Sequence, residues 1–388
     1  MATPRRIRIL IVDDSAVMRS LLRSVVSADS ALEVAGTAAD GASALSSLEG
    51  LHPDLILLDV EMPVMDGLVT LRELRRRGHR MPVIMCSSLT QRGAKVTLEA
   101  LAGGASDYVA KPAGQVNREA AIRALGQELG PKIRALTSSL QATIPALADR
   151  GSSSAAASFA VGLRSPLFLP PTQPQRSHPI VSRPTVLLIG VSTGGPAALD
   201  VLLPALPRDF PLPVLIVQHM PEVFTRLFAE RLDGRCRLRV REASEGDPVR
   251  PGTILIARGN WHMEVVAAAY GGAPPTLRLN QGPPENHCRP AVDVLFRSAA
   301  AAYGAGALAV VLTGMGSDGM LGCRMIHEHG GAVMAQDQAS STVWGMPGAV
   351  TNAGLAHRVL PLGDIATEVV RLVNRTYSEA TELRESIV

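Results

Sequence analysis

The chain has 388 residues, of which 46% are hydrophobic and 19% are charged. At about 100–200 residues per domain, this length predicts two or three domains with a sizeable core. A disordered chain and a small disulfide scaffold are therefore excluded. The 38 basic and 35 acidic residues leave a net charge of +3, which is too balanced to indicate a nucleic-acid partner or an anionic membrane. Aromatic residues make up only 3% of the chain, which argues against a base-stacking surface.

The cysteines and the N-terminus indicate the compartment. The four cysteines include no C-x-x-C pair, which suits a reducing environment and gives no zinc signature. His287 beside Cys288 lacks further ligands at metal-binding spacing. The first residues lead directly into a strand-like segment rather than a signal-peptide core, and no apolar run approaches the roughly 18 residues of a membrane span. We therefore predict a soluble, cytoplasmic protein that does not insert into a membrane.

The N-terminal part of the chain alternates apolar, strand-like runs with amphipathic segments. Near-continuous apolar strands between helices indicate a parallel sheet that is covered on both faces. The expected strands lie at 8–14, 54–59, 82–88 and 107–112, and helices are expected near 16–27 and 67–77.

Chemically distinctive residues stand at four strand ends in this part. Asp13 and Asp14 end the first strand, Asp59 ends the second, and Ser87 and Lys111 follow the next two. Ligands gather at the carboxyl ends of parallel strands, and clustered carboxylates repel each other unless a hard divalent cation such as Mg²⁺ lies among them. Asp59 can then attack a phosphoryl group. Any one of these residues alone is more often a helix cap or a solvated charge. The occurrence of all of them at four separate strand ends instead favours a functional site.

The composition changes sharply between about residues 137 and 184. Residues 151–158 read GSSSAAAS, and residues 165–175 are rich in proline. Such segments cannot bury enough apolar surface to offset the entropy of ordering, so we expect a flexible linker here.

After the linker the alternation of strands and helices resumes, which predicts a second doubly wound α/β domain. The two halves share no motif, so the chain is not an internal repeat. The expected strands of the second half lie at 185–192, 212–220, 253–258 and 307–316.

The second domain opens with a G-x-S-x-G turn at residues 190–194. In that geometry a sharp turn between strand and helix lifts the serine hydroxyl, here of Ser192, clear of the sheet. Pro196 suits the first helical turn, where free backbone N–H groups can hold an oxyanion. The same short motif also fits a phosphate-binding turn or a plain tight connection, so catalysis requires a base and an orienting acid nearby.

Two further strand ends supply candidates for those roles. His219 lies at the end of strand 212–220, at the same sheet edge as Ser192, and Asp318 lies in a glycine-rich loop after strand 307–316. The order Ser-His-Asp differs from the Ser-Asp-His order of α/β-hydrolases. From the residues alone, other carboxylates remain open as the third member: Asp233, Asp247 and Asp293.

The segments LIVDDSAVMR, LLDVEMPVMDGL, SSLT and DYVAKP resemble a response-regulator receiver domain over about residues 5–125. The resemblance implies that Asp59 accepts a phosphoryl group from a phosphohistidine on a CheA-type sensor histidine kinase. It implies Ser87 and Lys111 as the switch hydroxyl and the phosphate-binding lysine, and Tyr108 as the switch aromatic. The implied Mg²⁺ ligands are Asp13, Asp14, Asp59 and the backbone carbonyl of Glu61.

The segments GVSTGGP, QHMP, HCRPAVDVLFRSAA, LTGMGSDGM and AQDQASSTVWGMPGAV resemble the catalytic domain of CheB-type protein-glutamate methylesterases over about residues 183–375. The resemblance selects Ser192 as the nucleophile, His219 as the general base and acid, and Asp318 as the orienting carboxylate. It implies the backbone N–H groups of Met315 and Thr193 as oxyanion donors, and no cofactor in this domain.

Together the two resemblances span nearly the whole chain. They imply a flavodoxin-like receiver domain at 1–130, a flexible linker at 131–182 and a doubly wound, parallel-sheet methylesterase domain at 183–388. The implied function is a phosphorylation-activated methylesterase, also a glutamine deamidase, that acts on cytoplasmic chemoreceptor helices through an acyl-enzyme and gives sensory adaptation in chemotaxis. The alternative is the same esterase acting on a receptor of a non-motility chemosensory array.

Two other classes of protein fit the sequence less well. A phosphorylation-dependent binding protein would not need the complete Ser192, His219 and Asp318 set. A receiver-coupled transcription factor would need a helix-turn-helix pattern or a basic patch, and the sequence has neither. Within the resemblance, the segment 257–263 departs from the family pattern near the substrate contacts, and the C-terminal ESIV carries no aromatic docking peptide.

Overall fold

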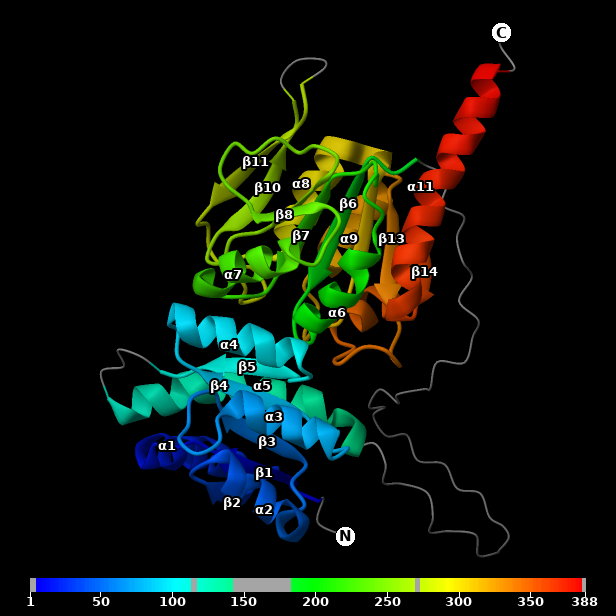
Figure 1. Cartoon of the computed structure of the whole chain (residues 1–388). Helices are drawn as coiled ribbons and strands as arrows, with labels where there is room; N and C mark the ends of the chain where they lie inside the picture. Colours follow the sequence, from blue (N-terminus) through cyan, green and yellow to red (C-terminus); the bar gives the residue numbers. More distant parts are fainter. Residues whose placement is uncertain (1–4, 113–116, 142–182, 269–272, 386–388) are drawn as a thin grey trace, which may run out of the picture.

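A computed structural model describes residues 5–112, 117–141, 183–268 and 273–385 of the chain. Two α/β domains lie one above the other in Figure 1, with the N-terminal domain in blue and cyan and the C-terminal domain in green to red. The predicted linker segments at 151–158 and 165–175 lie outside the described residues. Within the described ranges, no helix combines the length and hydropathy of a transmembrane segment.

The N-terminal domain is a five-stranded parallel sheet in the order β2-β1-β3-β4-β5. Strands β3 and β4 are buried throughout because helices cover both faces of the sheet. The strands are β1 (Ile7–Val12), β2 (Leu32–Ala38), β3 (Leu55–Asp59), β4 (Val83–Ser87) and β5 (Asp107–Ala110). The helices are α1 (Ala16–Ser27), α2 (Gly41–Leu51), α3 (Gly67–Arg76), α4 (Gln91–Ala102) and α5 (Arg118–Gln141).

Helix α5 continues past residue 130, where the sequence analysis placed the start of the linker. The helix continues because Leu129, Ile133 and Leu136 are buried in the same apolar cluster as β1 and α1. Residues 131–141 are therefore the last turns of a packed helix rather than linker. The small and polar residues that mark the linker in the sequence begin only after this apolar stripe ends.

The C-terminal domain is a seven-stranded parallel sheet in the order β14-β13-β12-β6-β7-β9-β8, with a separate antiparallel pair, β10 and β11. Its main strands are β6 (Val186–Val191), β7 (Val214–Gln218), β8 (Arg239–Glu242), β9 (Thr253–Ile256), β12 (Ala307–Val311), β13 (Ala332–Gln336) and β14 (Arg358–Leu360). The pair is β10 (His262–Val266) and β11 (Thr276–Asn280). The helices are α6 (Gly195–Leu202), α7 (Glu222–Asp233), α8 (Val292–Tyr303), α9 (Met320–Glu328), α10 (Met346–Asn352) and α11 (Leu362–Glu385).

Alternate residues of the central strand β6 enter different apolar clusters. Leu187 and Ile189 join one cluster, while Val186 and Leu188 join the other. Because side chains alternate across a strand, these clusters lie on opposite faces of the sheet. Both domains therefore have the helix-covered parallel sheets that the apolar runs predict, and the α/β fold class is confirmed.

The two domains pack against each other through helix α4, which contacts α6 and α7 (Figure 1). One continuous cluster of buried apolar residues includes Leu98 and Leu101 of α4 together with Phe224 and Phe228 of α7. The ring of Tyr108 on β5 stacks on Phe224, with centroids 4.7 Å apart and an interplanar angle of 22°. The carboxyl edge of the C-terminal sheet therefore faces the N-terminal domain.

Glycine is required where α3 starts against the end of β3. A Cβ on Gly67 would overlap the backbone carbonyl oxygen of Asp59. We predict that Gly67→Ala lowers the free energy of unfolding by about 1–3 kcal/mol, because overpacking forces the backbone to shift. Urea unfolding measures the change, and Gly50→Ala on α2 is the matched control. A Cβ on Gly50 would meet no atom of the described residues within 4 Å, so equal effects of the two changes would contradict this account.

Candidate active site and phosphoacceptor site

The N-terminal domain gathers carboxylates at the carboxyl edge of its sheet. Asp13 and Asp59 are buried and Asp14 is exposed, and one carboxylate oxygen from each lies within 4.8 Å of the others. Lys111 Nζ lies 2.9 Å from Asp13 Oδ2 and 2.7 Å from Asp59 Oδ2. The structure thus brings together four residues that the sequence analysis placed at three separate strand ends.

The charges of this pocket suit a divalent cation. Burial raises the pKa of Asp59, Lys111 lowers it and the charge of Asp13 raises it, and the net shift is upward. Burial opposes the charge on Lys111, but its hydrogen bonds to Asp13 and Asp59 raise its pKa overall. Three ionised carboxylates and one ammonium leave two negative charges, and carboxylate oxygens are the ligands that Mg²⁺ prefers. The residues present therefore fit a magnesium ion.

The other predicted receiver residues occupy different surroundings. Ser87 is buried at the end of β4, and its hydroxyl donates to the carbonyl of Ser88 at 3.1 Å. The backbone N–H of Glu61 donates to Asp59 Oδ1 at 3.4 Å, and the metal-binding role of its carbonyl stays a prediction. Tyr108 lies buried between the two domains.

In the C-terminal domain, the three predicted catalytic residues follow three adjacent strands. Ser192 follows β6, whose neighbours in the sheet are β7 and β12. His219 follows β7, and its backbone N–H donates to Val191 O at 3.1 Å. Asp318 lies in the loop after β12. The turn at Ser192 needs Gly194, which has a φ of 78° and no room for a side chain beside Thr342.

The imidazole of His219 is fixed by a buried carboxylate. Its Nε2 lies 2.7 Å from Asp318 Oδ2, and its Nδ1 lies 3.5 Å from Cys288 Sγ. The Asp318 carboxylate also accepts hydrogen bonds from the backbone N–H groups of Val292 and Gly319. Among the described residues, no hydrogen bond joins the Ser192 hydroxyl to the imidazole. Asp318, rather than one of the open alternatives, is the carboxylate that contacts this histidine.

The alternatives have other partners. Asp233 accepts a hydrogen bond from the backbone of Val240, and Asp247 pairs with Arg241. Asp293 is buried and accepts from the backbone N–H of Gly322 at 2.7 Å. These three carboxylates thus stabilise loops and strands of the domain, and the described residues show no hydrogen bond from any of them to His219.

Two side chains at the site escaped the sequence analysis. Gln218 is 2% exposed, and its Nε2 donates to the carbonyls of Ser192 and His219, both at 3.1 Å. Asn286 Nδ2 donates to Asp318 Oδ1 at 3.0 Å and to Asp293 Oδ2 at 2.9 Å, so it lies between two buried carboxylates. In the sequence, Gln218 opens the segment QHMP and Asn286 directly precedes the segment HCRPAVDVLFRSAA, but these positions do not reveal the contacts.

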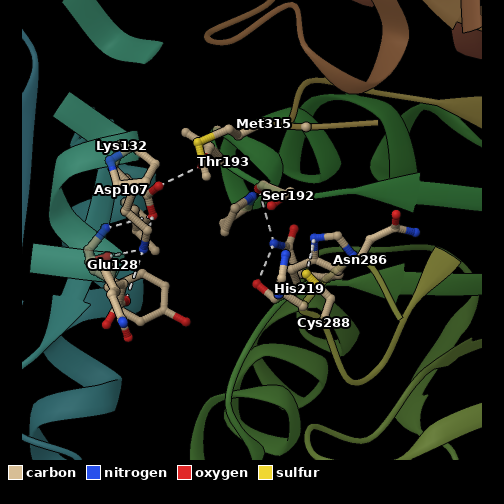
Figure 2. A pocket seen from close by; sticks show the side chains of 18 residues that line it. Asp107, Glu128, Lys132, Ser192, Thr193, His219, Asn286, Cys288 and Met315 are labelled. Atoms are coloured by element: carbon tan, nitrogen blue, oxygen red, sulfur yellow. Dashed lines mark hydrogen bonds and ion pairs between the residues drawn. The ribbon is translucent and has the colours of Figure 1, made fainter. Parts of the chain in front are cut away.

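Residues of both domains enclose the site. A cavity of about 740 Å³ is lined by Ser192, His219 and Met315 from one domain and by Asp107, Tyr108 and Lys132 from the other (Figure 2). Thr193 Oγ1 donates to Asp107 Oδ2 at 2.7 Å, and both side chains are buried. Lys132 Nζ donates to the carbonyl of Tyr108 at 2.5 Å and lies 3.4 Å from Asp107 Oδ1. The N-terminal domain thus covers the turn that carries Ser192.

Comparisons with known proteins agree with this division of the chain. Residues 187–369 match the CheB methylesterase family, and residues 9–123 match the response regulator receiver domain. A Nocardioides protein named protein-glutamate methylesterase/protein-glutamine glutaminase is 50% identical over 373 residues, covering 95% of this chain and 96% of that protein. The chain belongs to the CheB methylesterase family. It is therefore a methylesterase that carries a regulatory receiver domain.

Two further proteins are similar to this chain, one over nearly its whole length and the other over half of it. A Trichodesmium erythraeum protein with the same name is 45% identical over 368 residues, covering 95% of this chain and 99% of that protein. The crystal structure of the Thermotoga maritima CheB methylesterase catalytic domain is 41% identical and covers 50% of this chain and 100% of that chain, with a TM-score of 0.48.

The protonation of His219 depends on Asp318. Burial alone lowers the pKa of His219, but hydrogen bonds to Asp318 and Cys288 raise it from 6.5 to about 10. The charged form therefore stabilises the fold fully below about pH 6.5, and this stabilisation is lost as the pH rises through about 10.

We predict that Asp318→Asn lowers the pKa of His219. Burial favours the neutral imidazole, and the variant lacks the carboxylate charge that offsets this effect in the wild type. An NMR titration of the imidazole protons measures this pKa, with exposed Asp209→Asn as the control. An unchanged titration of His219 in Asp318→Asn would contradict the assigned pairing.

Proposed function

We propose that this member of the CheB family hydrolyses glutamate γ-methyl esters and deamidates glutamines on the cytoplasmic helices of chemoreceptors. The observation that carries the proposal is the placement of Ser192 between the strands that supply His219 and Asp318, with the imidazole held at 2.7 Å from the carboxylate. The names of the relatives support the same pair of reactions. Adaptation in a chemotaxis pathway is the role proposed for these reactions.

The chemistry begins with the loss of a proton from His219. Once neutral, its Nδ1 is the nitrogen left to serve Ser192, because Nε2 is engaged by Asp318. Ser192 Oγ attacks the ester carbonyl while Nδ1 takes its proton, and methanol leaves with that proton. Water then hydrolyses the glutamyl-serine ester through the same two proton transfers. With a glutamine side chain, ammonia leaves in place of methanol.

Two backbone groups are suitable for the oxyanion of the tetrahedral intermediate. The N–H groups of Thr193 and Met315 donate no hydrogen bond within the part of the chain that the structure describes, and both residues line the cavity. Losing one such donor typically costs roughly 10²–10³ in kcat. Gln218 acts as a positioning residue, because one amide group holds the backbone carbonyls of both Ser192 and His219.

We further propose that phosphorylation of Asp59 by a CheA-type histidine kinase controls access to this site. Asp13, Asp14 and Asp59 would hold Mg²⁺, which when bound supplies positive charge to the phosphoryl oxygens. Lys111 would contribute a second positive charge from the end of β5, and Ser87 a hydroxyl donor from the end of β4.

Strand β5 links phosphorylation to the esterase. Asp107 and Tyr108 on this strand contact Thr193 and Phe224, and Lys111 directly after it binds Asp59. A phosphoryl group on Asp59 would shift Lys111 from the carboxylate to the phosphoryl oxygens and displace β5, which weakens the contacts that cover the cavity. The population with an open site then increases.

Replacing the nucleophile tests the proposed chemistry. We expect Ser192→Ala in the full chain to reduce methanol release from methylated chemoreceptor by at least about 10⁴-fold, because no acyl-enzyme can form. Ser46→Ala, at an exposed position on α2, should match the wild type. Methanol is measured with and without a small phosphodonor, and release that persists in Ser192→Ala would exclude the serine mechanism.

A further inference from the structure

The thiol of Cys288 faces the proposed catalytic base. Its Sγ lies 3.5 Å from His219 Nδ1 (Figure 2). Nε2 of the same ring lies 2.7 Å from Asp318 Oδ2. A nucleophile, a base and an orienting acid in hydrogen-bond contact form the usual arrangement of an activated thiol. In this conformation the thiol, not the Ser192 hydroxyl, occupies the nitrogen that must accept the serine proton.

Cys288 is also a cysteine that is both accessible to small molecules and in contact with a basic side chain. It is partly exposed and lines both the 740 Å³ cavity and an adjacent cavity of about 540 Å³. Cys86 and Cys323 are buried, and burial raises the pKa of both thiols. Cys236 is partly exposed, but burial and the nearby Asp200 and Asp233 raise its pKa to about 11.

The contact also affects the base. Burial lowers the pKa of His219, whereas the hydrogen bonds to Asp318 and then to Cys288 raise it to about 10. Once the ring is neutral, Nδ1 can take the proton of the adjacent thiol. The thiolate formed in this way is the form of cysteine that reacts with peroxides and other soft electrophiles.

We propose that Cys288 is an oxidation site for hydroperoxides and that its oxidation reversibly inactivates the esterase. His219 Nδ1 takes the thiol proton, and the sulfur attacks one peroxide oxygen. The S–O bond forms as the O–O bond breaks. The departing hydroxide takes the proton from His219, so that Cys–SH and H₂O₂ give Cys–SOH and water. Sulfur is oxidised by two electrons and the peroxide is reduced.

The product blocks the chemistry proposed for Ser192. The sulfenic oxygen would lie between the sulfur and Nδ1, where a hydrogen bond from the new hydroxyl occupies the acceptor that Ser192 needs. Sulfenic acids are reduced by thiols, so the inactivation is reversible. Only the activity part of this inference rests on the proposed function, because oxidation itself does not require esterase turnover.

Chemical trapping tests the oxidation site directly. The full chain is treated with H₂O₂ and the sulfenic-acid reagent dimedone, and the labelled peptides are quantified by mass spectrometry. We expect Cys288 to be labelled ahead of Cys236. His219→Gln should slow labelling of Cys288 at least about tenfold, because the base is lost, and Asp318→Asn is a second variant with the same expected direction. Labelling of Cys236 ahead of Cys288, or equal rates in both variants and the wild type, would overturn the proposal.

Methanol release tests the consequence. Peroxide should abolish the activity of the wild type, and dithiothreitol should restore it. Cys288→Ala should keep at least about ten times more of its own starting activity than the wild type after the same treatment, whereas Cys236→Ala should be as sensitive as the wild type. Equal sensitivity of Cys288→Ala would overturn the link to inactivation, even where the labelling result holds. A chain without esterase activity would still show the labelling, so failure of the proposed function is separately visible.

Discussion

A buried hydrogen bond, from Thr193 Oγ1 to Asp107 Oδ2 at 2.7 Å, connects the receiver domain to the turn that carries Ser192. A buried polar pair of this kind is expensive to leave unmade, because each group loses water when the domains dock. Asp107 is also held by Lys132, which binds the carbonyl of Tyr108 next to it. The docked arrangement therefore depends on a few polar groups within a largely apolar interface.

The position of this bond explains how two distant sites can be coupled. Strand β5 is only four residues long, yet it contacts the esterase domain through Asp107 and Tyr108 and leads directly into Lys111 beside Asp59. A short strand cannot absorb a displacement at one end without moving the other. In this account the receiver acts as a cover whose fit depends on the charge state of Asp59, and the linker keeps the released receiver close to the site.

The sequence was sufficient to predict those site residues that stand at strand ends. Parallel sheets bring their carboxyl ends to one edge, so Asp13, Asp59 and Lys111 meet, and the same rule places Ser192 and His219 on neighbouring strands. The positions of the strands along the chain and the residues that follow them are sufficient for these predictions.

Other contacts could not be predicted because they depend on how separate segments pack. Asn286 lies in a left-handed conformation with a φ of 51° and meets Asp293 and Asp318 only after three segments have folded together. The contact of Cys288 with His219 likewise joins segments 69 residues apart. The Asp107–Thr193 bond additionally requires the two domains to dock. The linker was predicted to begin at residue 131, but α5 ends at Gln141, because the burial of Ile133 and Leu136 against the N-terminal domain depends on tertiary packing.

The most direct test of the account measures methanol release by the full chain before and after adding Mg²⁺ and acetyl phosphate. The account predicts that Mg²⁺ and acetyl phosphate increase the rate of methanol release by the wild type and leave the rate of Asp59→Asn unchanged. Thr193→Val removes the hydrogen-bond donor to the buried Asp107 Oδ2, at a cost of about 1–3 kcal/mol to the docked state. The basal rate of this variant should therefore already be about 5- to 150-fold higher than that of the wild type. The hydroxyl of Thr351 has no hydrogen-bond partner among the residues that the structure describes, so Thr351→Val should behave like the wild type. Stimulation that persists in Asp59→Asn, or an unchanged basal rate in Thr193→Val, would contradict the account.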